Sequence, residues 1–113
     1  MIYEIRNYHV EPAVIEEYAD WVSRFALPYL RRHLDLAGFW IGTDAPTQVT
    51  GRPLDDLGPA NVTWMIRWSD LDTRNRVMAQ LFGPQSGEWS EITSHHPGRQ
   101  HYLRIEARFA RAL

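Results

Sequence analysis

The sequence predicts an α+β domain with one four-stranded antiparallel sheet and helices on one face of that sheet. The first observation is the β-branched and aromatic run Asn61–Trp68, which follows a Gly-Pro turn signal and suits a central strand. The second is the order β-α-β-β-α-β of the strand-like and helix-like segments, which is the split βαβ arrangement. The third is the length of 113 residues, which suits a single domain spanning 1–113.

Composition disfavours several classes of function. The formal net charge is −2 and no block of Lys or Arg stands alone, so the basic stripe of a nucleic-acid-binding protein is missing. Cys is absent, which removes disulfides, thiolate catalysis and Cys-ligated metals. No run approaches the ~18 apolar residues of a membrane span, and no signal peptide is visible. We expect a cytoplasmic protein that binds neither nucleic acid nor membranes.

The first strand and helix are predicted from periodicity. Ile2–Val10 alternates like a strand, and both of its faces mix apolar and polar groups, as in an inner strand. Glu11-Pro12 then opens a helix, because Pro is tolerated at the first helical position. Pro28 falls inside the helical pattern and predicts a kink or broken turn near Arg24–Leu27. The apolar stripe of this helix consists of Ile15, Tyr18, Val22, Phe25 and Tyr29.

A second strand and a long loop precede the central strand. Leu36–Thr43 is the strand, in which Gly38 and Gly42 mark bends or close approaches of the backbone. Asp44–Ala60 contains five Gly and Pro residues and shows neither helical nor strand periodicity. It is longer than most connections in compact domains, and we interpret it as a flap, with a functional lid as the alternative.

Two helices and a last strand follow the central strand. Ser69 or Asp70 caps a helix that Gly83-Pro84 ends, and a shorter helix runs from about Gly87 to Thr93. Gln100–Phe109 is the last strand. We expect one of its faces to carry Leu103, Ile105, Ala107 and Phe109, and the other to carry Tyr102, Arg104, Glu106 and Arg108.

The central strand also predicts a partner. Its alternate residues Val62, Trp64, Ile66 and Trp68 are all apolar, and Met65 lies on its other face. Helices on one side of the sheet leave the other side bare, and a bare patch containing these four residues would exceed what soluble monomers display. We therefore predict a homodimer through the bare face, with two sheets closing into one barrel.

Several short motifs resemble those of the NIPSNAP family. They are Met1–Tyr8 followed by Pro12, Pro28-Tyr29-Leu30, Gly38-Phe39-Trp40, Arg67–Leu71 and the segment around Trp89. The resemblance implies a ferredoxin-like domain that pairs into a dimeric α+β barrel. The activity of the family is poorly defined, so the resemblance implies a fold more readily than a reaction. The chain departs from the family in its long Asp44–Ala60 segment.

The dimeric α+β barrel superfamily that this resemblance implies includes cofactor-free monooxygenases and haem-degrading monooxygenases. The haem enzymes use an Asn on the first strand, a Trp ending the third strand and a His after the second helix. Asn7 and Trp68 match the first two places, and His95 lies in the region of the third without a clean alignment. The adjacent His95 and His96 would point in opposite directions on an extended segment. We interpret them as surface imidazoles, and predict no metal and no cofactor.

The candidate catalytic residues are His9, Asn7 and His101. A strand His beside Asn7 is suited to act as a general base near neutral pH, although a His held by hydrogen bonds is the alternative. The charged residues Glu4, Arg6, Arg67, Arg104, Glu106 and Arg108 either form ion pairs across the sheet or hold an anionic substrate. The candidate substrate-binding residues are Tyr3, Tyr18, Trp40, Trp64, Arg67 and Trp68.

Three functions are compatible with these features. The first is a NIPSNAP-like protein of undefined activity that binds a small hydrophobic or aromatic molecule between sheet and helices. The second is a cofactor-free monooxygenase or isomerase acting on an aromatic or polyketide-like compound. The third is a non-catalytic structural or partner-recruiting dimer.

Overall fold

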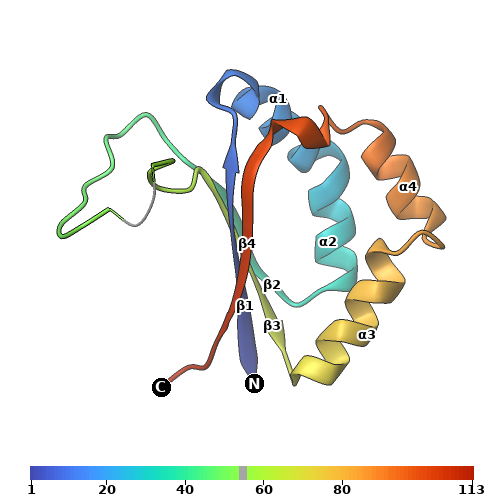
Figure 1. Cartoon of the computed structure of the whole chain (residues 1–113). Coiled ribbons are helices and arrows are strands. Elements are labelled where there is room, and N and C mark those ends of the chain that lie inside the picture. Colours follow the sequence, from blue (N-terminus) through green and yellow to red (C-terminus); the bar gives the residue numbers. More distant parts are fainter. Residues whose placement is uncertain (54–55) are drawn as a thin grey trace.

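The computed structural model describes residues 1–53 and 56–113, and it contains one four-stranded antiparallel sheet with helices on one side (Figure 1). The strand order is β2-β3-β1-β4, and neighbouring strands are antiparallel. This confirms the predicted fold class. The strands are β1 (Ile2–Val10), β2 (Leu36–Ile41), β3 (Val62–Trp68) and β4 (Tyr102–Ala110).

The first helical segment runs without a break from Pro12 to His33 but changes its winding. It consists of η1 (Pro12–Val14), α1 (Ile15–Trp21), a π-helical segment η2 (Val22–Ala26) and α2 (Leu27–His33). The π segment ends two residues before Pro28, which has no N–H to donate to the carbonyl one turn earlier. The predicted broken turn is therefore confirmed as a π-helical segment.

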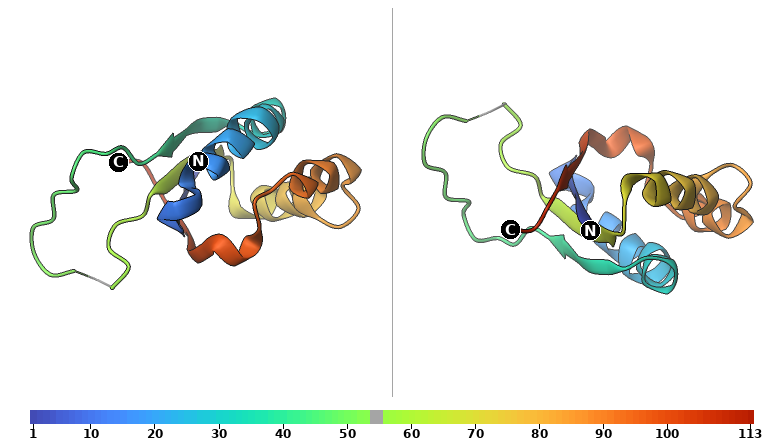
Figure 2. Two further views of the ribbon diagram at one scale, coloured as in Figure 1. Left: turned by 90° about the horizontal axis from the view of Figure 1, so that it is seen from above. Right: turned by 90° about the horizontal axis from the view of Figure 1, so that it is seen from below.

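The second helical region contains α3 (Leu71–Phe82), α4 (Gly87–Ser94) and the 3₁₀ turn η3 (Arg99–His101). Asp70 caps α3, because its side chain accepts a hydrogen bond from the backbone N–H of Thr73 at 2.7 Å. Views along the sheet show these helices on the side opposite the long loop between β2 and β3 (Figure 2). Residues 54 and 55 of the predicted Asp44–Ala60 loop lie outside the described residues.

The strand register shows which residues face the helices. In the β1–β3 pair, Glu4 lies opposite Ile66 and Arg6 lies opposite Trp64, and directly opposed residues share a face. The helix-covered face therefore carries the even-numbered residues of both strands. Its β3 residues Val62, Trp64, Ile66 and Trp68 are all buried. Our expectation that these four lie on the bare face was wrong, because the helices cover the strand's wholly apolar side and leave its mixed side open.

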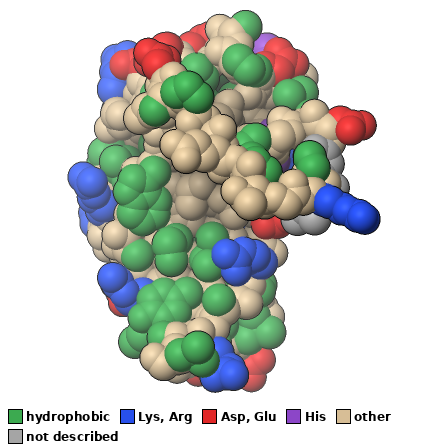
Figure 3. Space-filling model, turned by 90° about the vertical axis from the view of Figure 1, so that its left-hand side faces the viewer, with side chains coloured by type: hydrophobic (Ala, Val, Ile, Leu, Met, Phe, Trp, Pro, Cys, Tyr) green, Lys and Arg blue, Asp and Glu red, His purple; other side chains and the backbone are tan. Residues whose placement is uncertain are grey.

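The bare face of the sheet carries the odd-numbered residues of β1 and β3. It carries Tyr3, Ile5, Asn7 and His9 from β1, and Thr63, Met65 and Arg67 from β3. Trp40 of β2 lies opposite Thr63, is 49% exposed, and folds over Gly38, where a Cβ would lie 2.4 Å from the indole ring. The predicted close approach at Gly38 is thus confirmed. Figure 3 shows apolar side chains gathered on this face below the long loop.

The last strand begins two residues later than predicted, because Arg99–His101 forms the 3₁₀ turn η3, and its pairing with β1 shifts in register at His9 and Val10. Val10 pairs with Tyr102, so Tyr102 shares the helix-covered face with Ile105 instead of the bare face with Arg104. His101 lies in η3 and not in the strand. The predicted cross-sheet ion pairs run along single strands, as in Arg6–Glu4 and Arg104–Glu106, while Arg67 pairs with Asp35.

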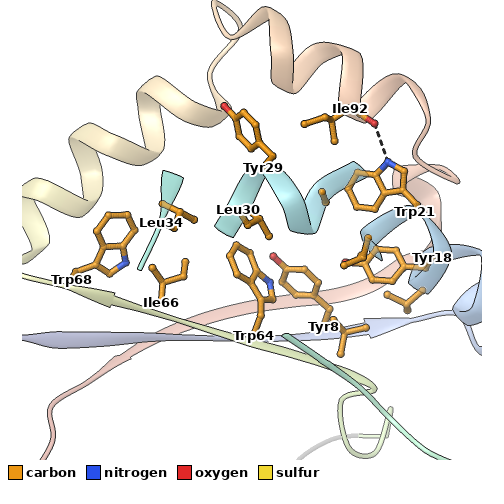
Figure 4. Close-up of a cluster of buried hydrophobic side chains, with 14 residues drawn as sticks. Tyr8, Tyr18, Trp21, Tyr29, Leu30, Leu34, Trp64, Ile66, Trp68 and Ile92 are labelled. Atoms are coloured by element: carbon orange, nitrogen blue, oxygen red, sulfur yellow. Dashed lines mark hydrogen bonds between the residues drawn. The ribbon is translucent and has the colours of Figure 1, made fainter. Parts of the chain in front are cut away.

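An aromatic core fills the space between sheet and helices. Figure 4 shows Tyr8 and Trp64 rising from the sheet toward Leu30 of α2, with their ring centroids 6.4 Å apart, and Tyr18 and Trp21 of α1 lying to one side of them. The indole N–H of Trp21 donates to the carbonyl of Ile92 at 2.9 Å, which ties α1 to α4. No helix of the described residues is both long enough and apolar enough to cross a membrane.

Candidate functional site

A cavity of about 350 Å³ lies between the helix-covered face of the sheet and the helices. Its floor is formed by side chains of β1 and β3, and its walls come from the first helical segment, α3 and α4. Exposed Arg99 and Ile105 also line it, so the cavity opens beside the edge strand β4. The aromatic and charged lining residues are Arg6, Tyr8, Tyr18, Trp21, Phe39, Trp64, Phe82, Trp89, Arg99 and Tyr102.

A buried ion cluster supports the floor of this cavity. The side chain of Glu4 is 0% exposed, and its Oε2 accepts hydrogen bonds from Arg6 Nη1 and Arg74 Nη2, each at 2.7 Å. Its Oε1 accepts from Arg74 Nε and from Trp68 Nε1, each at 3.0 Å. Burial alone would raise the pKa of Glu4, but the hydrogen bonds and charges of Arg74 and Arg6 outweigh burial and lower it. Glu4 is therefore ionised at neutral pH.

Arg6 connects this cluster to the cavity. Its Nε donates to the Tyr8 hydroxyl at 2.7 Å, and its guanidinium carbon lies 5.2 Å from the centroid of the Trp64 ring. The side chain is only 16% exposed. The buried Nε1 of Trp64 has no hydrogen-bond partner within the described part of the chain. The floor thus combines a fixed positive charge, an aromatic surface and an unpaired donor.

A chain of hydrogen bonds runs along one wall. His96 Nδ1 accepts from the backbone N–H of Gly98 at 2.9 Å, so Nε2 carries the proton of the neutral ring and donates to the Tyr102 hydroxyl at 2.9 Å. Tyr102 in turn donates to the Tyr18 hydroxyl at 3.4 Å. Burial raises the pKa of Tyr102 to about 12 and also raises the pKa of Tyr18. Both phenols are therefore neutral at physiological pH.

The two adjacent histidines occupy different environments. His95 is exposed, stacks on Phe25 with ring centroids 4.3 Å apart, and contacts Glu91. The ring of His96 is half-buried, 4.5 Å from the centroid of Trp21. The interpretation of both as surface imidazoles was therefore wrong for His96. The cause is the end of α4 at Ser94, which turns the next residues back toward the core.

Acidification is expected to destabilise the protein through His96. Burial, together with the positive charges of Arg99 and His101, lowers the pKa of His96 below its ordinary value of 6.5. The unfolded chain then binds this proton more tightly than the folded chain does, so the free energy of unfolding falls as pH drops through 6.5 toward the lower folded pKa. Between pH 8 and 5, the free energy of unfolding measured with urea should fall less in His96→Gln than in the unaltered chain. An equal dependence of the unfolding free energy on pH in both proteins would contradict this role of His96.

The predicted substrate-binding residues are divided between the two faces of the sheet. Tyr18 and Trp64 line the cavity, and Trp68 shares their side but holds Glu4 instead. Tyr3, Trp40 and Arg67 lie on the bare face. Tyr102 was not predicted as a site residue, and Arg6 was predicted only as one of several residues that form ion pairs or hold an anionic substrate. The alternation of β1, which places Arg6 and Tyr8 on one face with the buried Val10, was the signal that would have singled out Arg6.

Two of the predicted catalytic residues lie together in a second hollow of about 640 Å³, between the bare face and the long loop. Asn7 Oδ1 accepts from the Thr63 hydroxyl at 2.7 Å, and His9 Nε2 donates to the Gly58 carbonyl at 2.7 Å. His101 does not line this hollow, and its Nδ1 lies 3.2 Å from a carboxylate oxygen of Glu11. The catalytic role of all three residues stays a prediction.

The residues do not fit a haem site of the kind that the resemblance suggests. Asn7 lies on the bare face and Trp68 lies on the helix-covered face, so one ligand cannot contact both. His95 is exposed and stacked on Phe25. Among residues 1–53 and 56–113, no group of three or more His, Cys, Asp or Glu side chains is placed to hold a metal ion.

The fold is similar to those of solved NIPSNAP proteins. A NIPSNAP family protein of unknown function from Agrobacterium tumefaciens matches with a TM-score of 0.70 and 22% identity, over 97% of this chain and 86% of that chain. A NIPSNAP domain protein from Burkholderia xenovorans matches with a TM-score of 0.73 and 18% identity, over 100% and 95%. An antibiotic biosynthesis monooxygenase matches more distantly, with a TM-score of 0.56, 10% identity and coverage of 100% and 99%.

No family model and no curated protein matches the chain. The structural matches confirm the predicted resemblance to NIPSNAP proteins at the level of the fold. They also bear out the relation to the ferredoxin-like α+β barrel proteins, again as a shared fold.

Proposed function

We propose that the protein binds a small aromatic or hydrophobic molecule in the cavity between the sheet and the helices. The observation that carries this proposal is the cavity itself, which has about 350 Å³ of space and is lined mainly by aromatic rings. Cavities of this size, with apolar walls and a few polar groups, are typical of small-molecule sites. Arg6, Tyr8 and Trp64 supply those polar groups on the floor.

Closing the mouth of the cavity is expected to abolish binding. Ile105 lines the opening and is 42% exposed, so Ile105→Trp would place an indole across it. We expect binding of 1-naphthamide, a neutral bicyclic probe, to weaken by roughly tenfold or more, because the cavity loses the volume that the rings need. Isothermal titration calorimetry measures this directly.

Leu103→Trp provides the matched control. Leu103 lies on the same strand and is 48% exposed, but it does not line the cavity. This variant should bind 1-naphthamide like the unaltered chain. Equal weakening in both variants, or full binding by Ile105→Trp, would contradict the proposed location of the site.

The partner proposed for the bare face is a second copy of the chain. Tyr3, Ile5, Met65 and Trp40 place apolar side chains on this face without helices to cover them. A second sheet packed against the first would bury these side chains and close a barrel, which is the arrangement that the family resemblance implies. In such a dimer each copy keeps its own cavity on the far, helix-covered side of its sheet.

A further inference from the structure

We infer that the ligand of the cavity carries an anionic oxygen group, such as a carboxylate, which Arg6 binds at the cavity floor. This inference rests on the proposed function and names the chemical class of the ligand. It makes the expected ligand an aromatic or hydrophobic acid, with its ring system against the aromatic walls.

The charges around the cavity support an anion. Two arginines, Arg6 and Arg99, line it, and no Asp or Glu does so among the described residues. Behind the floor, Glu4 is shared between Arg6 and Arg74, so this cluster holds two positive charges against one negative charge. The excess is local, since the whole chain has a formal net charge of −2. An anion beside Arg6 would neutralise a charge that is otherwise costly to keep away from water.

The unused hydrogen-bond donors point to the same ligand. Arg6 uses Nη1 on Glu4 and Nε on Tyr8, and its Nη2 donates to no described residue. Trp64 is 6% exposed, yet its buried Nε1–H has no acceptor in the described part of the chain. Buried donors nearly always have partners, so this donor calls for an acceptor that the chain does not supply. Nη2 of Arg6 is not buried in the same way, and a ligand carboxylate beside it would accept a hydrogen bond from Nη2 in place of water and pair with the charge of Arg6.

The aromatic walls of the cavity indicate the shape of the rest of the ligand. Phe39 stacks on Trp64 with ring centroids 5.6 Å apart, which leaves a flat apolar surface next to the guanidinium of Arg6. Phe82 and Trp89 close the helix side with their rings nearly perpendicular. A planar ring system fits against such surfaces and places an attached carboxylate toward Arg6.

The test compares two probes that share a ring system and differ in charge. 1-Naphthoate carries a carboxylate, and 1-naphthamide is its neutral counterpart. We expect the unaltered chain to bind naphthoate about 10- to 100-fold more tightly by calorimetry at low salt, as for a hydrogen bond to a charged group. Arg6→Gln should remove this preference, so that the affinity for naphthoate falls by a larger factor than the affinity for naphthamide. Arg76→Gln, which removes an exposed arginine of α3, should keep the preference.

A second variant keeps the test decisive if Arg6→Gln does not fold, as judged by near-UV circular dichroism. Arg99 is exposed at the mouth, and Arg99→Gln should weaken naphthoate binding by about two- to fivefold and naphthamide binding by a smaller factor. Equal affinity of the unaltered chain for both probes would overturn the anion inference and leave the proposed cavity intact. Absence of binding by either probe would overturn the proposed function and this inference with it. A naphthoate preference retained by folded Arg6→Gln would overturn the role of Arg6.

Discussion

Glu4→Gln is expected to lower the free energy of unfolding by about 3 kcal/mol, which is a large part of the stability of a small domain. The substitution keeps the shape of the side chain and removes only its charge. Arg6 and Arg74 then lose their shared counterion, and their side chains are 16% and 21% exposed, so water replaces it poorly. Because both arginines keep some contact with water, we expect the lower end of the usual 3–5 kcal/mol range.

Urea unfolding at pH 7 measures this loss, with Glu91→Gln as the control. The Glu91 side chain is 77% exposed and, within the described part of the chain, forms an ion pair with the imidazole of His95, so its loss should cost no more than about 1 kcal/mol. The pKa of Glu4 is lowered, so its contribution is present above pH 4.5 and is lost as pH falls through the folded pKa. Glu4→Gln should lack this acid-dependent loss. Equal destabilisation by the two substitutions would contradict the buried ion cluster.

Met65→Glu is expected to convert a dimer into a monomer. Met65 lies on the bare face of β3, opposite Ile5 of β1 and Gly38 of β2, at the centre of the apolar surface assigned to the second copy. A carboxylate there would be buried without a partner when two sheets pack together, at a cost of several kcal/mol. Sedimentation equilibrium should give twice the chain mass of 13.2 kDa for the unaltered protein and 13.2 kDa for the variant.

Ala79→Glu is the control for this experiment. Ala79 is an exposed residue of α3, on the helix side of the sheet, so a carboxylate there should leave the dimer intact. If the unaltered chain itself sediments at 13.2 kDa, the bare face has no second copy and this part of the proposal fails.

The elements were predictable because each has a strong local cause. The alternation of Ile2–Val10 gave the bounds of β1, and Pro28 predicted the disturbed helical turn that the structure shows as η2. Asp70 caps α3 as its position before an apolar-periodic segment suggested. These signals act within one or two helical turns, and they require no knowledge of what packs against the element.

The faces of the sheet were not predictable in the same way. β3 carries apolar residues on both sides, since Met65 opposes the Val62–Trp68 set, so alternation alone does not say which side the helices cover. The register shift at His9 and Val10 added a second error, because it moved Tyr102 to the helix-covered face. Both depend on tertiary packing that no short pattern records.

The errors in the predicted site residues resulted from the errors in assigning the two faces of the sheet. Tyr3, Trp40 and Arg67 were chosen for their side-chain type, and the structure places them away from the cavity. Arg6 was considered as an ion-pair residue or an anion-binding residue, yet a charged residue in an alternating strand resembles an ordinary surface position. Its burial depends on Glu4 and on Arg74, which is 70 residues beyond Glu4 in the chain. That long-range pairing is what makes Arg6 part of the cavity floor.

A crystal structure of the protein soaked with 1-naphthoate would show where this ligand binds. We expect density for the naphthalene rings in the cavity against Trp64, with the carboxylate within hydrogen-bond distance of the Arg6 guanidinium. Density in the hollow beside Asn7 and His9, or a cavity closed by its own side chains, would contradict this expectation.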